Sequence, residues 1–245
     1  MIIMKNLLTI LAIILMPTLM VAQSQVIKED IEVVDDFHTI HLNARYTVYL
    51  KQSNETKIEV RALKEVMDIS EFKISDGALS INVKRDGKNK SIWEQIDDIK
   101  IAPKLDVFIS MRNINALNVN GNGKLITENS ISSKELTLTN SGSGTLEADI
   151  KGGILSIINS GSGLIKLTGY ADSANISLSG YGKIEAYKLD LKTANASLTG
   201  SGDMEINVKD QLDAKVYGGG KILFKGNTKK VTKKEHGLGK VERTY

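Results

Sequence analysis

Apolar and polar residues alternate on both sides of a glycine triplet that recurs along the second half of the chain. An apolar residue stands two positions after the second glycine of every triplet, and another often follows two positions later. The first of these positions holds Leu125, Leu146, Ile165, Ile184, Met204, Ile222 and Val241. Because successive side chains of a strand point to opposite faces, the pattern predicts short strands with one buried face.

The triplets follow one another with a nearly constant period. Their glycines are Gly121/Gly123, Gly142/Gly144, Gly161/Gly163, Gly180/Gly182, Gly200/Gly202, Gly218/Gly220 and Gly237/Gly239, and the second glycines are 21, 19, 19, 20, 18 and 19 residues apart. Glycine suits a sharp corner because it adopts positive φ and has no Cβ to clash. One such unit cannot bury its apolar face alone, so the units should stack about 4.8 Å apart. The sequence therefore predicts an all-β fold, a β-solenoid or parallel β-helix with coils of about 19 residues.

Individual copies depart from this pattern. Most strands before a corner end on an apolar residue two positions before the triplet, as Leu178 does, but Leu138 and Ile157 stand two residues earlier. We interpret this offset as the insertion of an Asn-Ser pair. The corner serines should lie outside: Ser141, Ser143, Ser160, Ser162 and Ser201. In the last copy charged residues replace inward apolar ones, which predicts a polar terminal cap containing Lys233, Glu235 and Arg243.

Residues 23–110 are predicted to form a less regular β region that is continuous with the regular solenoid of residues 111–245. The Asp76-Gly77 pair between two alternating runs predicts a hairpin. The segment "KEVMDIS" predicts one helical turn, and "DGKNKSIWEQIDDIK" an excursion from the coils. The segment "IHLNARYTVYL" fits a degenerate coil if its residues are aligned with later ones: Ile40 with Leu117, Leu42 with Val119, Ala44 with Gly121, and Val48 with Leu125.

The first residues are typical of a secretory signal peptide, which we place at residues 1–22. Lys5 precedes an apolar run from Leu7 to Ala22 that is broken by Pro17 and is shorter than the roughly 20 residues of a spanning helix. We expect an exported protein and leave open whether it is periplasmic, cell-surface or extracellular. The chain has no cysteine, which excludes a disulfide framework, a thiolate metal site and a lipidated cysteine.

The net charge of +3 is unevenly distributed. Eight basic and two acidic residues lie between Lys221 and Tyr245, which gives that segment +6. A basic end could meet an anionic surface or polymer, or it could be a solvated cap. The sequence leaves both interpretations open.

The order of these segments resembles one known family. The stretch "DDFHTIHLNARYTVYLKQ", the hairpin "GALSINVK", the stretch "VFISMRNINALNVNGNGKL" and the "SGSG" corners are similar to the putative auto-transporter adhesin, head GIN domain family. The resemblance spans about Ile31 to Tyr245 and implies a secreted or surface-exposed β-helical protein with an adhesive role. It implies no catalytic motif, and the chain shows no C-terminal translocator barrel.

Several kinds of site are disfavoured by the pattern. "GNGKL" and "GGGKI" lack the Ser or Thr of a nucleotide loop and lead into strands. A single aspartate, Asp203, does not match calcium-binding glycine repeats. The histidines His38, His41 and His236 lack metal-ligand spacing, and the first two should lie on opposite faces of a strand. We therefore predict no catalytic residue, metal site or cofactor.

One pair of carboxylates keeps an enzyme hypothesis open. Glu185 and Glu205 should lie about 5 Å apart on stacked coils, near the separation that retaining glycosidases use. Lys166 and Lys183 beside them favour an exposed ion-pair face instead. Our leading interpretation is an exported, non-enzymatic, adhesin-like solenoid that binds a surface glycan or protein, with no nucleic-acid partner, no membrane span in the mature chain, and a homo-oligomer left open. The alternative is a carbohydrate-active enzyme that uses these carboxylates.

Overall fold

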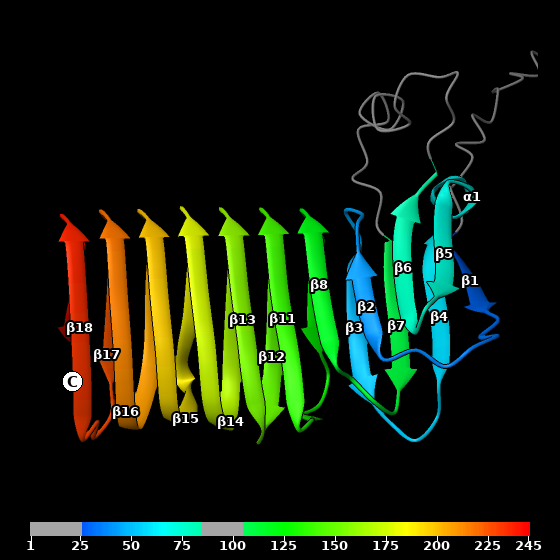
Figure 1. Cartoon of the computed structure of the whole chain (residues 1–245). Helices are drawn as coiled ribbons and strands as arrows, with labels where there is room; N and C mark the ends of the chain where they lie inside the picture. The colour runs from blue at the N-terminus through cyan, green and yellow to red at the C-terminus, as the bar shows by residue number, and fades with distance from the viewer. Residues whose placement is uncertain (1–25, 85–104) are drawn as a thin grey trace, which may run out of the picture.

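A computed structural model describes residues 26–84 and 105–245, which form two sheets and one short helix (Figure 1). The first part of the chain contributes seven strands and the helix: β1 (Val26–Ile31), β2 (Thr39–Leu42), β3 (Thr47–Gln52), β4 (Lys57–Leu63), α1 (Lys64–Asp68), β5 (Ser70–Ser75), β6 (Ala78–Val83) and β7 (Leu105–Met111). No helix in these two ranges is long and apolar enough to cross a membrane.

The glycine-rich part of the chain contributes the remaining strands. These are β8 (Ala116–Gly121), β9 (Lys124–Thr127), β10 (Ile131–Ser132), β11 (Glu135–Gly142), β12 (Thr145–Lys151), β13 (Ile154–Gly161), β14 (Leu164–Gly180), β15 (Lys183–Gly200), β16 (Asp203–Gly218), β17 (Lys221–Lys225), β18 (Lys230–Gly237) and β19 (Lys240–Arg243). β14, β15 and β16 are long because each runs through one return and along two sides of the coil. The prediction of an all-β solenoid is confirmed.

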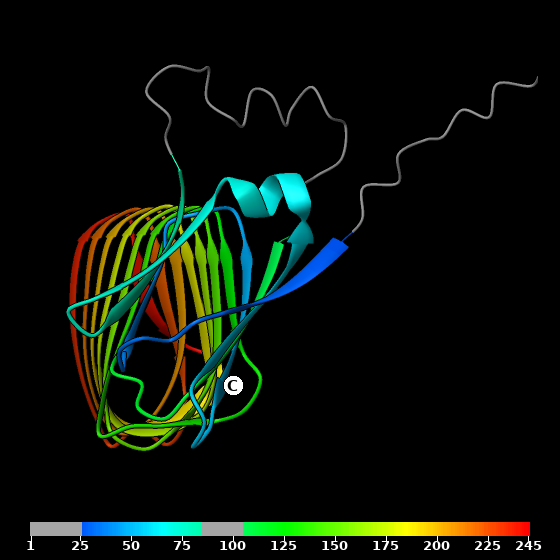
Figure 2. The same cartoon turned by 90° about the vertical axis from the view of Figure 1, so that its right-hand side faces the viewer.

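The strands form two sheets that enclose one core (Figure 2). The segments before each corner make the pre-corner sheet, in the order β5–β6–β2–β8–β11–β13–β14–β15–β16–β18. The segments after each corner make the post-corner sheet, in the order β1–β4–β7–β3–β9–β12–β14–β15–β16–β17–β19. All pairings from β3 and β2 onward to the C-terminal end are parallel, so equivalent residues stack in columns along the solenoid axis.

The two glycines of each triplet have different physical roles. Gly180 has φ of 107°, a conformation that residues with a Cβ rarely adopt. Gly182 has an ordinary φ, but a Cβ placed there would lie 2.7 Å from the carbonyl oxygen of Gly163 in the preceding coil. A Cβ at Gly180 would likewise lie 2.7 Å from the carbonyl oxygen of Gly161. The first glycine therefore turns the chain, and both glycines allow successive coils to approach at the ladder distance.

The inward column after each corner forms the centre of the core. Ile165, Ile184 and Met204 are fully buried and follow one another in register. The predicted corner serines are all exposed, as Ser143 and Ser162 illustrate. The inward and outward assignment of these positions is confirmed.

The predicted Asn-Ser insertion in the second and third copies is wrong. Asn140 pairs with Val119 and Asn159 pairs with Leu178, so the strands stay in register and the asparagines occupy inward positions. Both side chains are fully buried. The Asn159 amide donates to the carbonyl oxygens of Gly163 at 2.9 Å and Lys183 at 3.1 Å. A polar side chain is tolerated inside because these corner carbonyls accept its hydrogens.

The first part of the chain continues both sheets. β5 and β6 form the predicted hairpin, with positive φ at Asp76 and Gly77. Ile40 pairs with Leu117, as the degenerate-coil alignment predicts, and the pairings of Leu42 and Val48 are confirmed as well. The predicted helical turn is α1. The predicted signal peptide and the predicted excursion lie outside the described residues.

The last coil has charged side chains at inward positions. Lys233 pairs with Ala214, Glu235 with Val216 and Arg243 with Phe224. The Lys233 ammonium lies 5.3 Å from the centre of the Phe224 ring and donates to the Val241 carbonyl oxygen at 2.6 Å. The Val241 N–H donates to the Glu235 carboxylate and lowers its pKa. These contacts cover the end of the apolar core with groups that water can solvate.

Candidate functional site

The outer surface of the pre-corner sheet is polar and almost uncharged over its central strands. Its outward residues from β8 to β15 are mostly serine, threonine and asparagine: Asn118, Asn120, Thr137, Thr139, Ser141, Ser156, Ser160, Ser173, Asn175, Ser177, Ser179, Thr193, Asn195, Ser197 and Thr199. The outward exceptions over the same strands are Ala116, Glu135, Ile154 and Ile158. We call this surface the neutral face.

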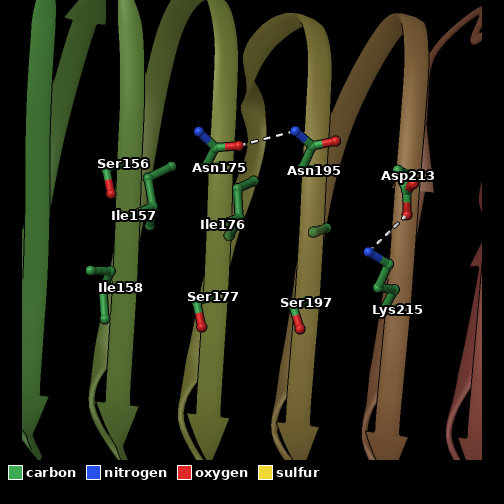
Figure 3. Close-up of a pocket in the computed structure, with 11 residues that line it drawn as sticks. Ser156, Ile157, Ile158, Asn175, Ile176, Ser177, Asn195, Ser197, Asp213 and Lys215 are labelled. Carbon is green, nitrogen blue, oxygen red and sulfur yellow. Dashed lines mark hydrogen bonds and ion pairs between the residues drawn. The ribbon is translucent and has the colours of Figure 1, made fainter.

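A groove of about 360 Å³ runs across the strands of the neutral face (Figure 3). One wall is formed by Ser156, Asn175, Asn195 and Asp213, and the other by Ile158, Ser177, Ser197 and Lys215. Each coil adds one residue to each wall, so the groove follows the solenoid axis. Asn195 donates to the Asn175 side-chain oxygen at 3.0 Å, which fixes two amides of the first wall.

The groove becomes charged at its C-terminal end. The Lys215 Nζ lies 3.9 Å from Asp213 Oδ1. This carboxylate oxygen is covered and has no hydrogen-bond partner in the described part of the chain. The nearby Lys215 ammonium offsets part of the cost of covering this oxygen.

The neutral face extends over the first part of the chain through a row of amides. Asn120 donates to Asn43 at 2.7 Å, and Asn43 donates to Asn82 at 2.8 Å. Asn82 donates in turn to the Glu71 carboxylate at 3.3 Å. Side chains linked in this way have few free rotamers, so this part of the surface is rigid. It is charged only at its outermost strand, which carries Glu71 and Lys73.

The outer surface of the post-corner sheet has the opposite character because it is covered by ion pairs. Lys124 lies 2.8 Å from Glu147, and Lys28 lies 2.8 Å from Glu59. Hydrogen bonds from Lys28 and then Arg61 lower the pKa of Glu59 to about 2. Tyr49 and Phe108 stack between these pairs, with ring centroids 4.9 Å apart.

The candidate catalytic carboxylates belong to this charged surface. Glu185 and Glu205 are register neighbours, and both contact the Lys183 ammonium, at 2.9 Å and 3.0 Å. Hydrogen bonds to Glu185 and then Glu205 raise the pKa of Lys183 to about 12. Lys166 lies opposite Glu185 on the next strand. Two carboxylates that share one ammonium form the arrangement expected of an exposed ion-pair face.

The third side of the solenoid, where the chain returns between the sheets, also pairs opposite charges between coils. Asp172 pairs with Lys192, and Asp210 pairs with Lys229 at 2.7 Å. The hydrogen bonds lower the pKa of each aspartate and raise that of each lysine. Charges on this side therefore alternate in sign along the axis.

The three histidines do not come together. His38 precedes β2 and packs against Gly77, while His41 lies on β2 and is partly exposed. His236 stacks on Tyr217 with ring centroids 5.0 Å apart. Within residues 26–84 and 105–245, no group of three or more His, Cys, Asp and Glu side chains could hold a metal ion.

The groove could have been found from the outward positions of the sequence, although not from the periodicity of the inward residues. The neutral face is built from residues one, three and five positions before the first glycine of each triplet, as Ser179, Ser177 and Asn175 precede Gly180. Aligning these outward positions shows the run of hydroxyl and amide side chains. The alignment requires the correct register in the second and third copies, which the assumed insertion obscured.

Solved structures share this fold at low sequence identity. A protein described as a putative adhesin from Bacteroides fragilis is 22% identical, with 90% of this chain and 97% of that chain covered and a TM-score of 0.77. A putative adhesin from Parabacteroides distasonis is 21% identical, with 91% and 98% covered and a TM-score of 0.71. A protein described as a putative lipid binding protein from Parabacteroides distasonis is 19% identical, with 91% and 98% covered and a TM-score of 0.70.

These TM-scores show a common fold. The comparison with curated proteins gave no match. A family model matches residues 36–228, which include most strands of both sheets, the corner glycines of six triplets and the whole groove. The resemblance noted in the sequence is thereby confirmed, and the chain belongs to the family described as putative auto-transporter adhesin, head GIN domain.

Proposed function

We propose that this chain is an exported, non-enzymatic binding protein that holds an uncharged surface glycan in the groove of the neutral face. The observation that carries the proposal is the contrast between the three sides of the solenoid. The neutral face presents uncharged hydroxyl and amide groups, whereas charged pairs cover the other two sides. An uncharged, hydroxyl-rich partner is complementary to the first surface and would have to displace ion pairs from the others.

The groove has the chemistry that sugar hydroxyls require. Serine hydroxyls donate and accept hydrogen bonds, and asparagine amides do both through separate atoms. Coils repeat about every 4.8 Å, so an extended polymer along the axis meets a new polar pair at each coil. Many weak, repeated contacts of this kind give useful affinity to a long chain.

The family assignment supports a binding role, and the names of two structural relatives agree with adhesion. The structure adds no support to the enzyme alternative, since Glu185 and Glu205 share an ion pair with Lys183. The alternative is a protein partner on the same face, and the glycan-binding experiment below distinguishes the two.

Export is part of the proposal and has a direct test. Lys5, the apolar run up to Ala22 and the absence of cysteine support secretion through a cleaved signal peptide. Protein recovered from cells should begin near Gln23. An intact N-terminus on cytoplasmic protein would contradict the proposed localisation.

Glycan binding is tested on an array of neutral and acidic polysaccharides, followed by affinity electrophoresis. Ser177→Arg places a long charged side chain in the middle of the groove, and Thr145→Arg places the same side chain on the post-corner surface of a neighbouring coil. We expect neutral glycans to bind the native chain and Thr145→Arg equally and Ser177→Arg at least tenfold more weakly. Ser177→Ala should bind almost normally, because one hydrogen bond among many contributes about 1 kcal/mol or less.

Equal binding by the two arginine variants would place the partner elsewhere on the molecule. Binding of proteins but of no glycan would replace the glycan by a protein partner. Polysaccharide cleavage by the native chain would contradict the non-enzymatic proposal.

A further inference from the structure

Positive charge is concentrated on the last two coils of the solenoid. Residues 221–245 hold eight basic residues and two acidic ones, a net charge of +6. Since the whole chain has +3, residues 1–220 have a net charge of −3. The basic residues, which we call the cationic end, are Lys221, Lys225, Lys229, Lys230, Lys233, Lys234, Lys240 and Arg243.

The cationic end differs in charge pattern from the third side of the solenoid. On the third side, charged neighbours on successive coils are of opposite sign. At the end, Lys215 is the register neighbour of Lys234, and Lys221 is the register neighbour of Lys240. Like charges on adjacent strands are destabilising. Lys229 pairs with Asp210 and Lys240 with Glu235, but Lys221, Lys230 and Lys234 have no carboxylate within ion-pair distance in the described part of the chain. These uncompensated charges favour an anionic partner.

The placement of the lysines indicates the shape of that partner. Lys230 and Lys234 belong to the pre-corner sheet and Lys221 and Lys240 to the post-corner sheet, while Lys229 lies on the third side. A linear polymer along one side would reach only part of this set. Two coils span about 10 Å, roughly one Debye length at 0.1 M salt, so a charged plane across the end attracts the whole set.

Exposed apolar side chains lie at the same end. Leu238 is 89% exposed between Gly237 and Gly239 at the last corner, and Tyr245 ends the chain fully exposed. Aromatic and leucine side chains beside cationic ones are typical of segments that lie in the headgroup region of a membrane. The end therefore presents both components of peripheral membrane binding.

We propose that the cationic end docks end-on against an anionic phospholipid surface. The lysines provide electrostatic attraction, and Leu238 enters the headgroup layer. Docking in this way directs the solenoid axis away from the membrane and leaves the groove of the neutral face open along its length. The docking is independent of whether that groove binds a glycan.

The test is co-sedimentation of the full chain with vesicles of phosphatidylcholine, with and without about one third phosphatidylserine. The test variant removes three charges from the cationic end: Lys221→Gln, Lys230→Gln and Lys234→Gln. The control variant removes three charges from exposed lysines at least three coils from that end: Lys51→Gln, Lys73→Gln and Lys166→Gln. Both variants carry the same net charge.

We expect the native chain and the control to bind the anionic vesicles, and none of the proteins to bind the neutral ones. Each lysine near such a surface raises the affinity about fivefold, so the loss of three lysines should weaken the binding of the test variant about 100-fold. Binding should fall steeply with salt. Leu238→Ser should weaken binding without changing its salt dependence.

Three results would overturn the docking proposal. An equal loss of vesicle binding in the test and control variants would mean that binding depends on net charge and not on the position of the lysines. Binding to anionic vesicles that does not respond to salt would exclude electrostatic docking. Binding to a soluble acidic polysaccharide such as polygalacturonate, with no binding to vesicles, would identify the end as a polymer site instead. The folding of each variant is checked by circular-dichroism melts.

Discussion

Replacing Ile184 by aspartate tests the stacked core at its centre. Ile184 is fully buried and lies in register between Ile165 and Met204. Loss of a buried isoleucine side chain costs about 2–5 kcal/mol. Burial of a polar group without a hydrogen-bond partner adds about 1–3 kcal/mol on the scale of protein mutations. We therefore expect Ile184→Asp to lower the free energy of unfolding by at least about 3 kcal/mol, or the melting temperature by at least about 6 °C.

The effect of Ile184→Asp should depend on pH with a definite sign. Desolvation disfavours the ionised carboxylate, so the pKa of the new aspartate should rise in the folded state above about 3.9, its value in the unfolded chain. The folded state then holds a proton that the unfolded state has lost. Stability should therefore decrease as pH rises from about 4 toward the raised pKa, by up to about 1.4 kcal/mol per pH unit.

The assay is urea unfolding followed by circular dichroism at pH 4, 6 and 8. Ile184→Ala serves as the control because it creates the cavity without the titrating group. The difference between the two variants should widen with pH. Wild-type stability of Ile184→Asp, or a constant difference across this pH range, would show that position 184 does not lie inside the ladder.

The remaining predictions concern the corner and the ion-pair surface. Gly182→Ala should destabilise the chain by more than about 1 kcal/mol in thermal melts because its Cβ would meet a carbonyl of the preceding coil at 2.7 Å, whereas Tyr181→Ala at the exposed corner should change little. Glu185→Gln and Glu205→Gln should each shift the free energy of unfolding by no more than about 1 kcal/mol and leave glycan binding intact. Polysaccharide cleavage by the native chain that is lost in either variant would favour an enzyme. The Lys183 ammonium should titrate by NMR at about 12, so its contribution to stability is complete below its unfolded pKa and is lost as pH rises through about 12. A midpoint unchanged by Glu185→Gln would contradict the cause assigned to that shift.

The coil and its core could be predicted from the sequence because both depend on local patterns of residues. The glycine triplets determine where the chain turns, and the alternation around them determines which side chains point inward, so the coil and its core column follow from neighbouring residues alone. The same alternation placed Ile40 on Leu117, although 77 residues separate them. The Asp76-Gly77 hairpin was predictable because it also depends only on local backbone preferences.

Other features depend on contacts between coils. The inward Asn140 and Asn159 looked like an insertion because a buried amide is unfavourable until a carbonyl is in reach, and those carbonyls come from the corners and the next coil. The meeting of Lys183 with two glutamates required the register of neighbouring strands.

The candidate binding surface was decided in the same way. Serine, threonine and asparagine are common in loops and exposed strands, so a single coil such as Asn175-Ile176-Ser177 carries no sign of a groove. The walls arise only when parallel pairing stacks equivalent residues of successive coils into columns. Sequence alone determined the coil, its period and its core because these follow from backbone preference and local alternation. Tertiary structure decided which outward residues become neighbours, because their contacts lie along the solenoid axis, perpendicular to the chain.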